Sequence, residues 1–233
     1  MNRLLALTLA LATVAGRASA QAQAPNTLTD QEKQDGWRLL WDGRTTEGWR
    51  SAKSDAFPAK GWEMRDGELS VLGQGGGDIV TREAFTNFEF ALEFRLTTGA
   101  NSGVKYFVDP PRYKSAMGLE YQLLDDEHHP DGKRGTTHTL ASLYDLIPAP
   151  AEKKVLPLGE WNVMRIVARG RHVEHWLNGA KVLEFDRGSP AYREAVAKSK
   201  FKSLPAFGES ESGLILLQDH GNRVSFRSIK IKP

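Results

Sequence analysis

The chain has no cysteine among its 233 residues, and its charges nearly balance, with 31 basic and 29 acidic side chains. Disulfide bonds are therefore excluded, and stability must come from the packed core alone. No block of Lys or Arg stands out, so composition gives no sign of a nucleic-acid partner. The apolar run at residues 4–14 is too short to span a bilayer, which takes roughly twenty apolar residues. The remaining length is enough for one sizeable core.

The first twenty residues have the pattern of a secretory signal peptide. Arg3 is basic, an apolar run follows, and Ala18-Ser19-Ala20 matches an A-x-A cleavage site. A retained anchor is the alternative, which the cleavage site disfavours, and the absence of cysteine excludes a lipoprotein anchor. We therefore expect residues 1–20 to be removed and the mature protein to reach a bacterial periplasm, or to be secreted, with no membrane contact. Residues 21–35 are polar and predict a flexible lead-in to a single domain at 36–233.

From Trp37 onward the pattern is short β-type runs separated by turn residues. In residues 88–96 the apolar side chains alternate with charged ones, which is typical of a half-buried strand. Asp66-Gly67 and Asn178-Gly179 are strong hairpin signals. Ser189 and Pro190 predict the start of one helix over residues 191–200. Many short strands favour an all-β sandwich or jelly roll. The predicted strands are 38–41, 62–65, 68–71, 78–81, 88–96, 103–108, 118–124, 140–144, 161–169, 172–177, 181–185, 213–218 and 224–232.

Two of these strands carry polar side chains where apolar ones are usual. Strand alternation places Glu120 and Gln122 on one face of 118–124, and places Gln218 and His220 together near the end of 213–218. If the sheet is curved, these faces converge on one concave site. A Glu near a His can perform general acid–base chemistry once burial shifts their pKa values. The alternative is that Glu120 is a solvated strand residue and His220 a loop residue.

Loops near these strands offer further candidates. Residues 125–132 are dense in carboxylates and histidines, and Asp125 could bind Ca²⁺ or Zn²⁺. The spacing matches neither an EF-hand loop nor the H-E-x-x-H zinc motif, and a solvated loop is the alternative. His138 follows in the same region. Asn101 begins a strand as a turn residue or at the rim of the cleft. His172 and His175 are interpreted as surface or filler residues.

An ordered set of short motifs extends over residues 36–232. These are the stretch 39–49, Asp66-Gly67, Asn87-Phe88-Glu89, Asn101-Ser102-Gly103, Gly118 with Glu120, Gln122 and Asp125, Leu143-Tyr144, Gly159-Glu160-Trp161-Asn162, Leu177-Asn178-Gly179, and the stretch 213–227. Together they resemble the 3-keto-disaccharide hydrolase family, bacterial domains formerly of unknown function.

The resemblance implies a concanavalin-like jelly roll of two antiparallel sheets with one short helix, acting on glycosides oxidised at C3. One position departs from the family pattern. Phe107 stands near the place where an Arg usually ends the strand after Asn101-Ser102-Gly103, and Lys105 or Arg112 could substitute for it.

The implied chemistry suits the candidate residues. A ketone at C3 acidifies the proton at C2; a base removes it, the glycosidic oxygen leaves from C1, and water adds back. Glu120 and His220 are the expected acid–base pair, and either of them could be the base. The expected substrate-binding residues are Asn101, Gln122, Gln218, His138 and, at the C3 oxygen, Lys105. A divalent cation could take that last role, with Glu120, Asp125 or His220 nearby.

The expected partner is thus a small saccharide, but two other functions stay open. A non-catalytic, lectin-like binding module could share the fold, because fold does not determine function. An ordinary glycoside hydrolase would require two carboxylates flanking the bond, and the sequence indicates only Glu120 firmly. The pairing of a carboxylate with an imidazole on the cleft face favours the enzyme over the binding module.

Overall fold

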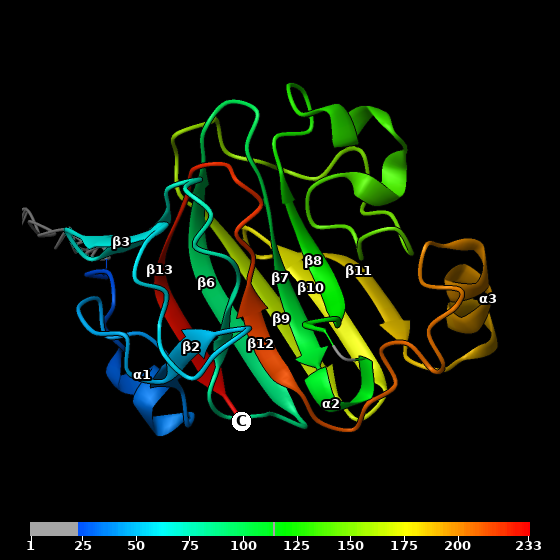
Figure 1. Ribbon diagram of the computed structural model, residues 1–233, viewed down its shortest axis with the longest axis horizontal. Helices are drawn as coiled ribbons and strands as arrows, with labels where there is room; N and C mark the ends of the chain where they lie inside the picture. The colour runs from blue at the N-terminus through cyan, green and yellow to red at the C-terminus, as the bar shows by residue number, and fades with distance from the viewer. Residues whose placement is uncertain (1–22, 114) are drawn as a thin grey trace, which may run out of the picture.

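Two antiparallel sheets face each other across one hydrophobic core (Figure 1). The computed structural model describes residues 23–113 and 115–233, so the predicted signal peptide lies outside the described residues. The larger sheet has the order β11-β10-β9-β6-β13-β4-β3, with β1 beside β13, and the smaller has the order β2-β5-β12-β7-β8. The fold class expected from the sequence, a jelly-roll sandwich of two antiparallel sheets, is confirmed.

The strand bounds are as follows. The larger sheet contains β1 (Arg38–Leu39), β3 (Trp62–Arg65), β4 (Glu68–Val71), β6 (Phe88–Leu96), β9 (Asn162–Arg169), β10 (His172–Leu177), β11 (Ala180–Asp186) and β13 (Val224–Lys232). The smaller sheet contains β2 (Trp49–Ser51), β5 (Ile79–Thr81), β7 (Asn101–Val108), β8 (Leu119–Leu124) and β12 (Leu214–Leu217). The helices are α1 (Asp30–Gln34), α2 (Pro110–Tyr113) and α3 (Pro190–Lys198), with 3-10 turns η1 (Pro130–Lys133) and η2 (Thr136–His138).

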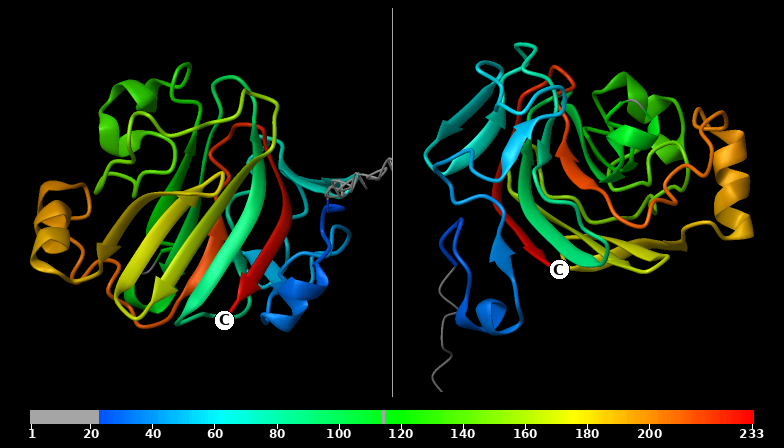
Figure 2. Two further views of the ribbon diagram at one scale, coloured as in Figure 1. Left: turned by 180° about the vertical axis from the view of Figure 1, so that it is seen from behind. Right: turned by 60° about the horizontal axis from the view of Figure 1, so that its bottom comes forward.

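The core follows from the alternation in the strands. In β6, Phe88, Phe90 and Phe94 are buried, while Glu89 and Glu93 point away from the core. Each fully buried side chain of this size contributes about 1.5–3 kcal/mol through the hydrophobic effect. Seen from below, both sheets curve, and α3 stands beyond their edge (Figure 2). This curvature gives the smaller sheet a concave outer face.

One predicted strand is wrong. Residues 140–144 form turns, and only Leu143 makes isolated bridges, to Tyr121 and Ile147. The cause is local backbone geometry: Ala141 and Asp145 adopt positive φ angles of 66° and 61°, which no regular strand accommodates. The segment therefore folds into a compact loop against β8. The short strand β2 was not predicted.

The predicted helix is confirmed as α3, with Ser189 as its N-cap and Pro190 in its first turn. Within the predicted lead-in, Thr29 and Glu32 form a capping box on α1. Glu32 also pairs with Lys230 of β13. No helix among the described residues is long and apolar enough to cross a membrane.

Candidate active site

Strands β7 and β8 form the floor of the site. Their antiparallel register pairs Lys105 with Glu120 and Gly103 with Gln122. Alternation therefore places the side chains of Lys105, Glu120 and Gln122 on the outer, concave face, while Tyr121 points into the core. The predicted division of faces in β8 is confirmed.

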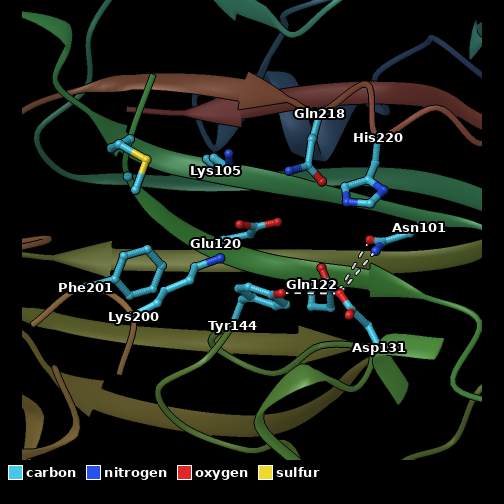
Figure 3. Close-up of a pocket in the computed structure, with 12 residues that line it drawn as sticks. Asn101, Lys105, Glu120, Gln122, Asp131, Tyr144, Lys200, Phe201, Gln218 and His220 are labelled. Carbon is cyan, nitrogen blue, oxygen red and sulfur yellow. Dashed lines mark hydrogen bonds between the residues drawn. The ribbon is translucent and has the colours of Figure 1, made fainter. Parts of the chain in front are cut away.

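A polar cavity of about 100 Å³ opens on this floor (Figure 3). Strand β12 runs beside β7, and the chain beyond it contributes Gln218 and His220. The loop after β8 supplies Asp131 and Tyr144, and the segment after α3 supplies Lys200 and Phe201. The full lining is Asn101, Lys105, Met117, Gly118, Glu120, Gln122, Asp131, Tyr144, Lys200, Phe201, Gln218 and His220.

Glu120 lies at the centre of the cavity, and only 7% of its surface is exposed. A Cβ atom added at Gly103 would approach its Oε1 to 2.3 Å, so the missing side chain of Gly103 leaves room for this carboxyl group. Burial raises the pKa of Glu120 above its ordinary value, although the ammonium groups of Lys105 and Lys200 act in the opposite direction. A carboxyl group with a raised pKa is suited to proton transfer near neutral pH.

Lys200 forms the opposite wall. Its Nζ lies 4.1 Å from the centre of the Tyr144 ring and 5.0 Å from that of Phe201, and in Figure 3 it points toward Glu120. Lys200 as a whole is exposed, yet burial of its ammonium group lowers its pKa. Two cations thus face one buried carboxyl group.

The other end of the cavity is rich in amides. Gln122 Nε2 donates to Asn101 Oδ1 at 3.5 Å, and Asn101 Nδ2 donates to Asp131 Oδ2 at 3.5 Å. The hydroxyl of Tyr144 donates to the same Asp131 oxygen at 3.3 Å. Among the described residues, the buried Oε1 atoms of Gln122 and Gln218 have no hydrogen-bond partner. Buried polar atoms are rarely left unpaired, so these oxygens suit the hydroxyl groups of a ligand.

Six of the eight residues predicted for the site line this cavity: Asn101, Lys105, Glu120, Gln122, Gln218 and His220. His138 does not line it. Its ring packs edge-on against Tyr144 with centroids 5.0 Å apart, and its Nε2 lies 3.3 Å from Asp145 Oδ1. His138 therefore packs against Tyr144, a residue of the cavity wall, without lining the cavity itself.

Asp125 also lies outside the cavity, and its carboxylate is already engaged. It accepts hydrogen bonds from the backbone N–H groups of Gly99, Glu127 and His128, and bonds to the His128 ring at 2.9 Å. Burial acts to raise the pKa of Asp125, but these bonds hold it below the ordinary value. The carboxylate caps the loop, which argues against the expected role as a metal ligand.

Side chains that could together bind a metal ion lie outside this cavity. In the described part of the chain, the single group of three is His172, Glu174 and Glu184 on β10 and β11. The Lys181 ammonium bonds Glu174 at 3.3 Å and Glu184 at 2.6 Å, so both carboxylates already have a cation. His175, interpreted from the sequence as a surface or filler residue, is fully buried between the sheets.

Phe107 stands near the place where the family pattern usually has an arginine, and of the two residues suggested as its substitutes only Lys105 lines the cavity. Phe107 is buried, and the Arg187 guanidinium lies 3.7 Å from its ring centre. Lys105 lines the cavity, whereas Arg112 bonds Ser210 outside it.

Sequence reasoning missed Asp131, Tyr144, Lys200 and Phe201, because they come from loops whose path no local pattern shows.

The chain is similar to known proteins over most of its length. The model of the 3-keto-alpha-glucoside-1,2-lyase-like domain family matches residues 36–232. A relative from Bacteroides thetaiotaomicron, named 3-keto-disaccharide hydrolase, is 36% identical over 229 residues, covering 85% of this chain and 78% of the relative.

Two solved structures from Parabacteroides distasonis, each described as a proposed glycosyl hydrolase, are also similar. The first has a TM-score of 0.81 and 32% identity, covering 90% of this chain and 99% of that one. The second has a TM-score of 0.69 and 29% identity, covering 84% and 98%. The chain therefore belongs to the 3-keto-alpha-glucoside-1,2-lyase-like domain family, which supports a glycosidase-like enzyme.

Proposed function

We propose that this protein cleaves the glycosidic bond of 3-keto glycosides, including 3-keto disaccharides, by elimination followed by hydration. The names of the matching family and of the Bacteroides relative support this substrate class. The observation that carries the proposal is Glu120, a buried carboxyl group with a raised pKa that faces two lysines in a polar cavity. An ordinary sugar has no acidic C–H bond for such a base, whereas a 3-keto sugar has one at C2.

The reaction begins with Glu120 as general base. Its carboxylate takes the proton from C2, the C–H electrons form a C2–C3 double bond, and the carbonyl electrons move onto the C3 oxygen. The resulting enolate requires a positive charge nearby. Lys105, the cross-strand neighbour of Glu120, supplies one and also favours the ionised form of the base.

Elimination follows from the enolate. The C3 carbonyl reforms, the double bond moves to C1–C2, and the glycosidic oxygen leaves C1 with the bonding electrons. His220, at the amide-rich end of the cavity (Figure 3), is the proposed acid that protonates it. Water then adds to C1 and gives its proton to His220, while C2 recovers a proton from Glu120, so both groups are restored and the net reaction is hydrolysis. Gln122 and Gln218 offer their unpaired oxygens to sugar hydroxyls.

The substitution Glu120→Gln tests this proposal because it keeps the size of the side chain and removes the base. We expect kcat on 3-keto-trehalose or a 3-keto glucoside to fall by about 10²–10⁴-fold, the usual contribution of a positioned base. Glu127→Gln, at an exposed position in the following loop, is the matched control and should retain full activity.

Unoxidised trehalose should not react with either protein. Full turnover by Glu120→Gln, or turnover of unoxidised sugars by the wild type, would contradict the proposed mechanism. Binding of 3-keto sugars without any turnover by the wild type would favour the lectin-like alternative.

A further inference from the structure

Lys200 is held at the cavity wall by its own backbone. Its N–H donates to Asp145 Oδ2 at 2.8 Å, which ties it to the loop that carries Tyr144. The next residue, Phe201, is buried and stacks on Phe207 with ring centroids 4.0 Å apart and an interplanar angle of 9°. These two attachments fix the direction from which the Lys200 side chain enters the cavity.

The ammonium group itself makes no ion pair within 4.0 Å in the described part of the chain. Its nearest defined partners are the faces of Tyr144 and Phe201. By contrast, Lys198, at the end of α3, is paired with Glu194 at 2.6 Å. A lysine fixed at its backbone, directed at Glu120 and left without a salt bridge is available to a ligand (Figure 3).

The two cavity lysines occupy different places. Lys105 is on the floor, in cross-strand register with Glu120, and its charge also acts on the carboxyl group of Asp78. Lys200 reaches in from the wall, across the cavity from that floor. A sugar lying over Glu120 would present its C2 proton to the floor and its C3 oxygen outward, toward the wall.

We propose that Lys200 is a catalytic residue: its ammonium group donates a hydrogen bond to the C3 oxygen of the bound 3-keto sugar and stabilises the enolate. This role rests on the proposed function and assigns the oxyanion to a residue outside the sheet. When Glu120 removes the C2 proton, one negative charge moves from Glu120 to the C3 oxygen, and Lys200 faces both positions. The lysine keeps its proton throughout, so the steps remain balanced as written above.

Kinetics of Lys200→Met, Lys200→Arg and Lys202→Met on a methyl 3-keto-glucoside test the assignment. Lys202 is an exposed lysine two residues further along the same segment and serves as the matched control. We expect Lys200→Met to lower kcat by about 10²–10³-fold, the usual effect of removing one oxyanion donor, with KM changed only a few-fold. Lys200→Arg should recover part of this loss because the charge remains, and Lys202→Met should behave as the wild type.

A second readout isolates the proton-transfer step. In D₂O, the wild type should exchange the C2 hydrogen of the 3-keto sugar, as followed by proton NMR, and Lys200→Met should exchange it at least tenfold more slowly. Because Lys200 is exposed, the substitution should leave the thermal midpoint within about 2 °C. If Lys200→Met proves unfolded, Lys200→Gln takes its place in both assays.

The outcomes separate the two proposals. An active wild type with kcat of Lys200→Met within threefold, or with a loss confined to KM, would reject the role of Lys200 alone. A wild type inactive on every 3-keto glycoside would reject the proposed function and the role of Lys200 with it.

Discussion

At the scale of single residues, a glycine decides where the proposed base lies. Gly103 of β7 lies two residues before Lys105, the position opposite Glu120, and glycine in a strand often marks the close approach of another group. Here that group is the Glu120 side chain, whose Oε1, Cδ and Cγ would lie 2.3, 3.0 and 3.0 Å from an added Cβ. All three belong to the flexible end of a side chain, so a methyl group would move Glu120 and leave the backbone in place.

Gly103→Ala is therefore expected to impair activity more than stability. Displacement of a reacting group by about 1 Å can cost 10²-fold in rate, and we expect kcat on a 3-keto glycoside to fall by at least tenfold. A double-mutant cycle with Glu120→Ala, followed by urea unfolding, provides the control: Gly103→Ala should destabilise the wild type more than it destabilises Glu120→Ala. Equal destabilisation in both backgrounds would show that the methyl group clashes with something else.

At the scale of elements, one buried histidine joins the larger sheet to the cavity loop. His175 of β10 bonds Ala141 O through Nδ1 at 3.0 Å and the Tyr106 hydroxyl through Nε2 at 2.8 Å. A carbonyl can only accept, so Nδ1 carries the proton and Nε2 accepts from Tyr106. Ala141 begins the turn that leads to Tyr144, and so the position of this wall residue depends on a side chain from the opposite sheet.

The substitution His175→Phe should leave the carbonyl of Ala141 and the hydroxyl of Tyr106 buried without partners. Each such group costs about 1–3 kcal/mol, so we expect a total loss of about 2–6 kcal/mol in the free energy of unfolding, measured with urea. KM for the 3-keto glycoside should also rise as Tyr144 shifts. His172→Phe, at the exposed start of the same strand, should cost less than about 1 kcal/mol. A fully stable His175→Phe would mean that water or a rearranged loop satisfies both groups.

At the scale of the whole molecule, the sequence predicted the sheets better than the site. Strand β6 is confirmed at both ends, because nine alternating residues leave one consistent register. The faces of β8 are confirmed for the same reason, and they bring Glu120 and Gln122 to one surface. Lys200 and Tyr144 could not be predicted, because their positions depend on loops that fold back over the sheet. Alternation determines which side of a strand a residue faces, but it carries no information about what a distant loop brings to that side.

Burial of ionisable groups also makes the stability of the whole domain depend on pH, in two opposing ways. Burial lowers the pKa of His175 from 6.5 to about 4. As pH falls, His175 is therefore protonated in the unfolded chain before it is protonated in the folded protein. Its contribution to the free energy of unfolding is complete above pH 6.5 and declines as pH falls toward 4. The decline amounts to about 3 kcal/mol at most, at 1.36 kcal/mol per pKa unit. Tyr106 and Tyr121, the titratable groups that face His175, have raised pKa values and stay neutral throughout this range.

The contribution of Glu120 to stability changes with pH in the opposite direction. Its folded pKa is raised above 4.5, so the folded state holds the proton more tightly and loses stability as pH rises from 4.5 through the folded pKa. Urea unfolding of Glu120→Gln between pH 4.5 and 7.5 should therefore show a protein more stable than the wild type at neutral pH, with this advantage shrinking toward pH 4.5. The same substitution removes the proposed base, so stability and turnover should change in opposite directions. A Glu120→Gln protein that is less stable than the wild type at pH 7 would mean that the lysines facing the carboxylate outweigh its burial.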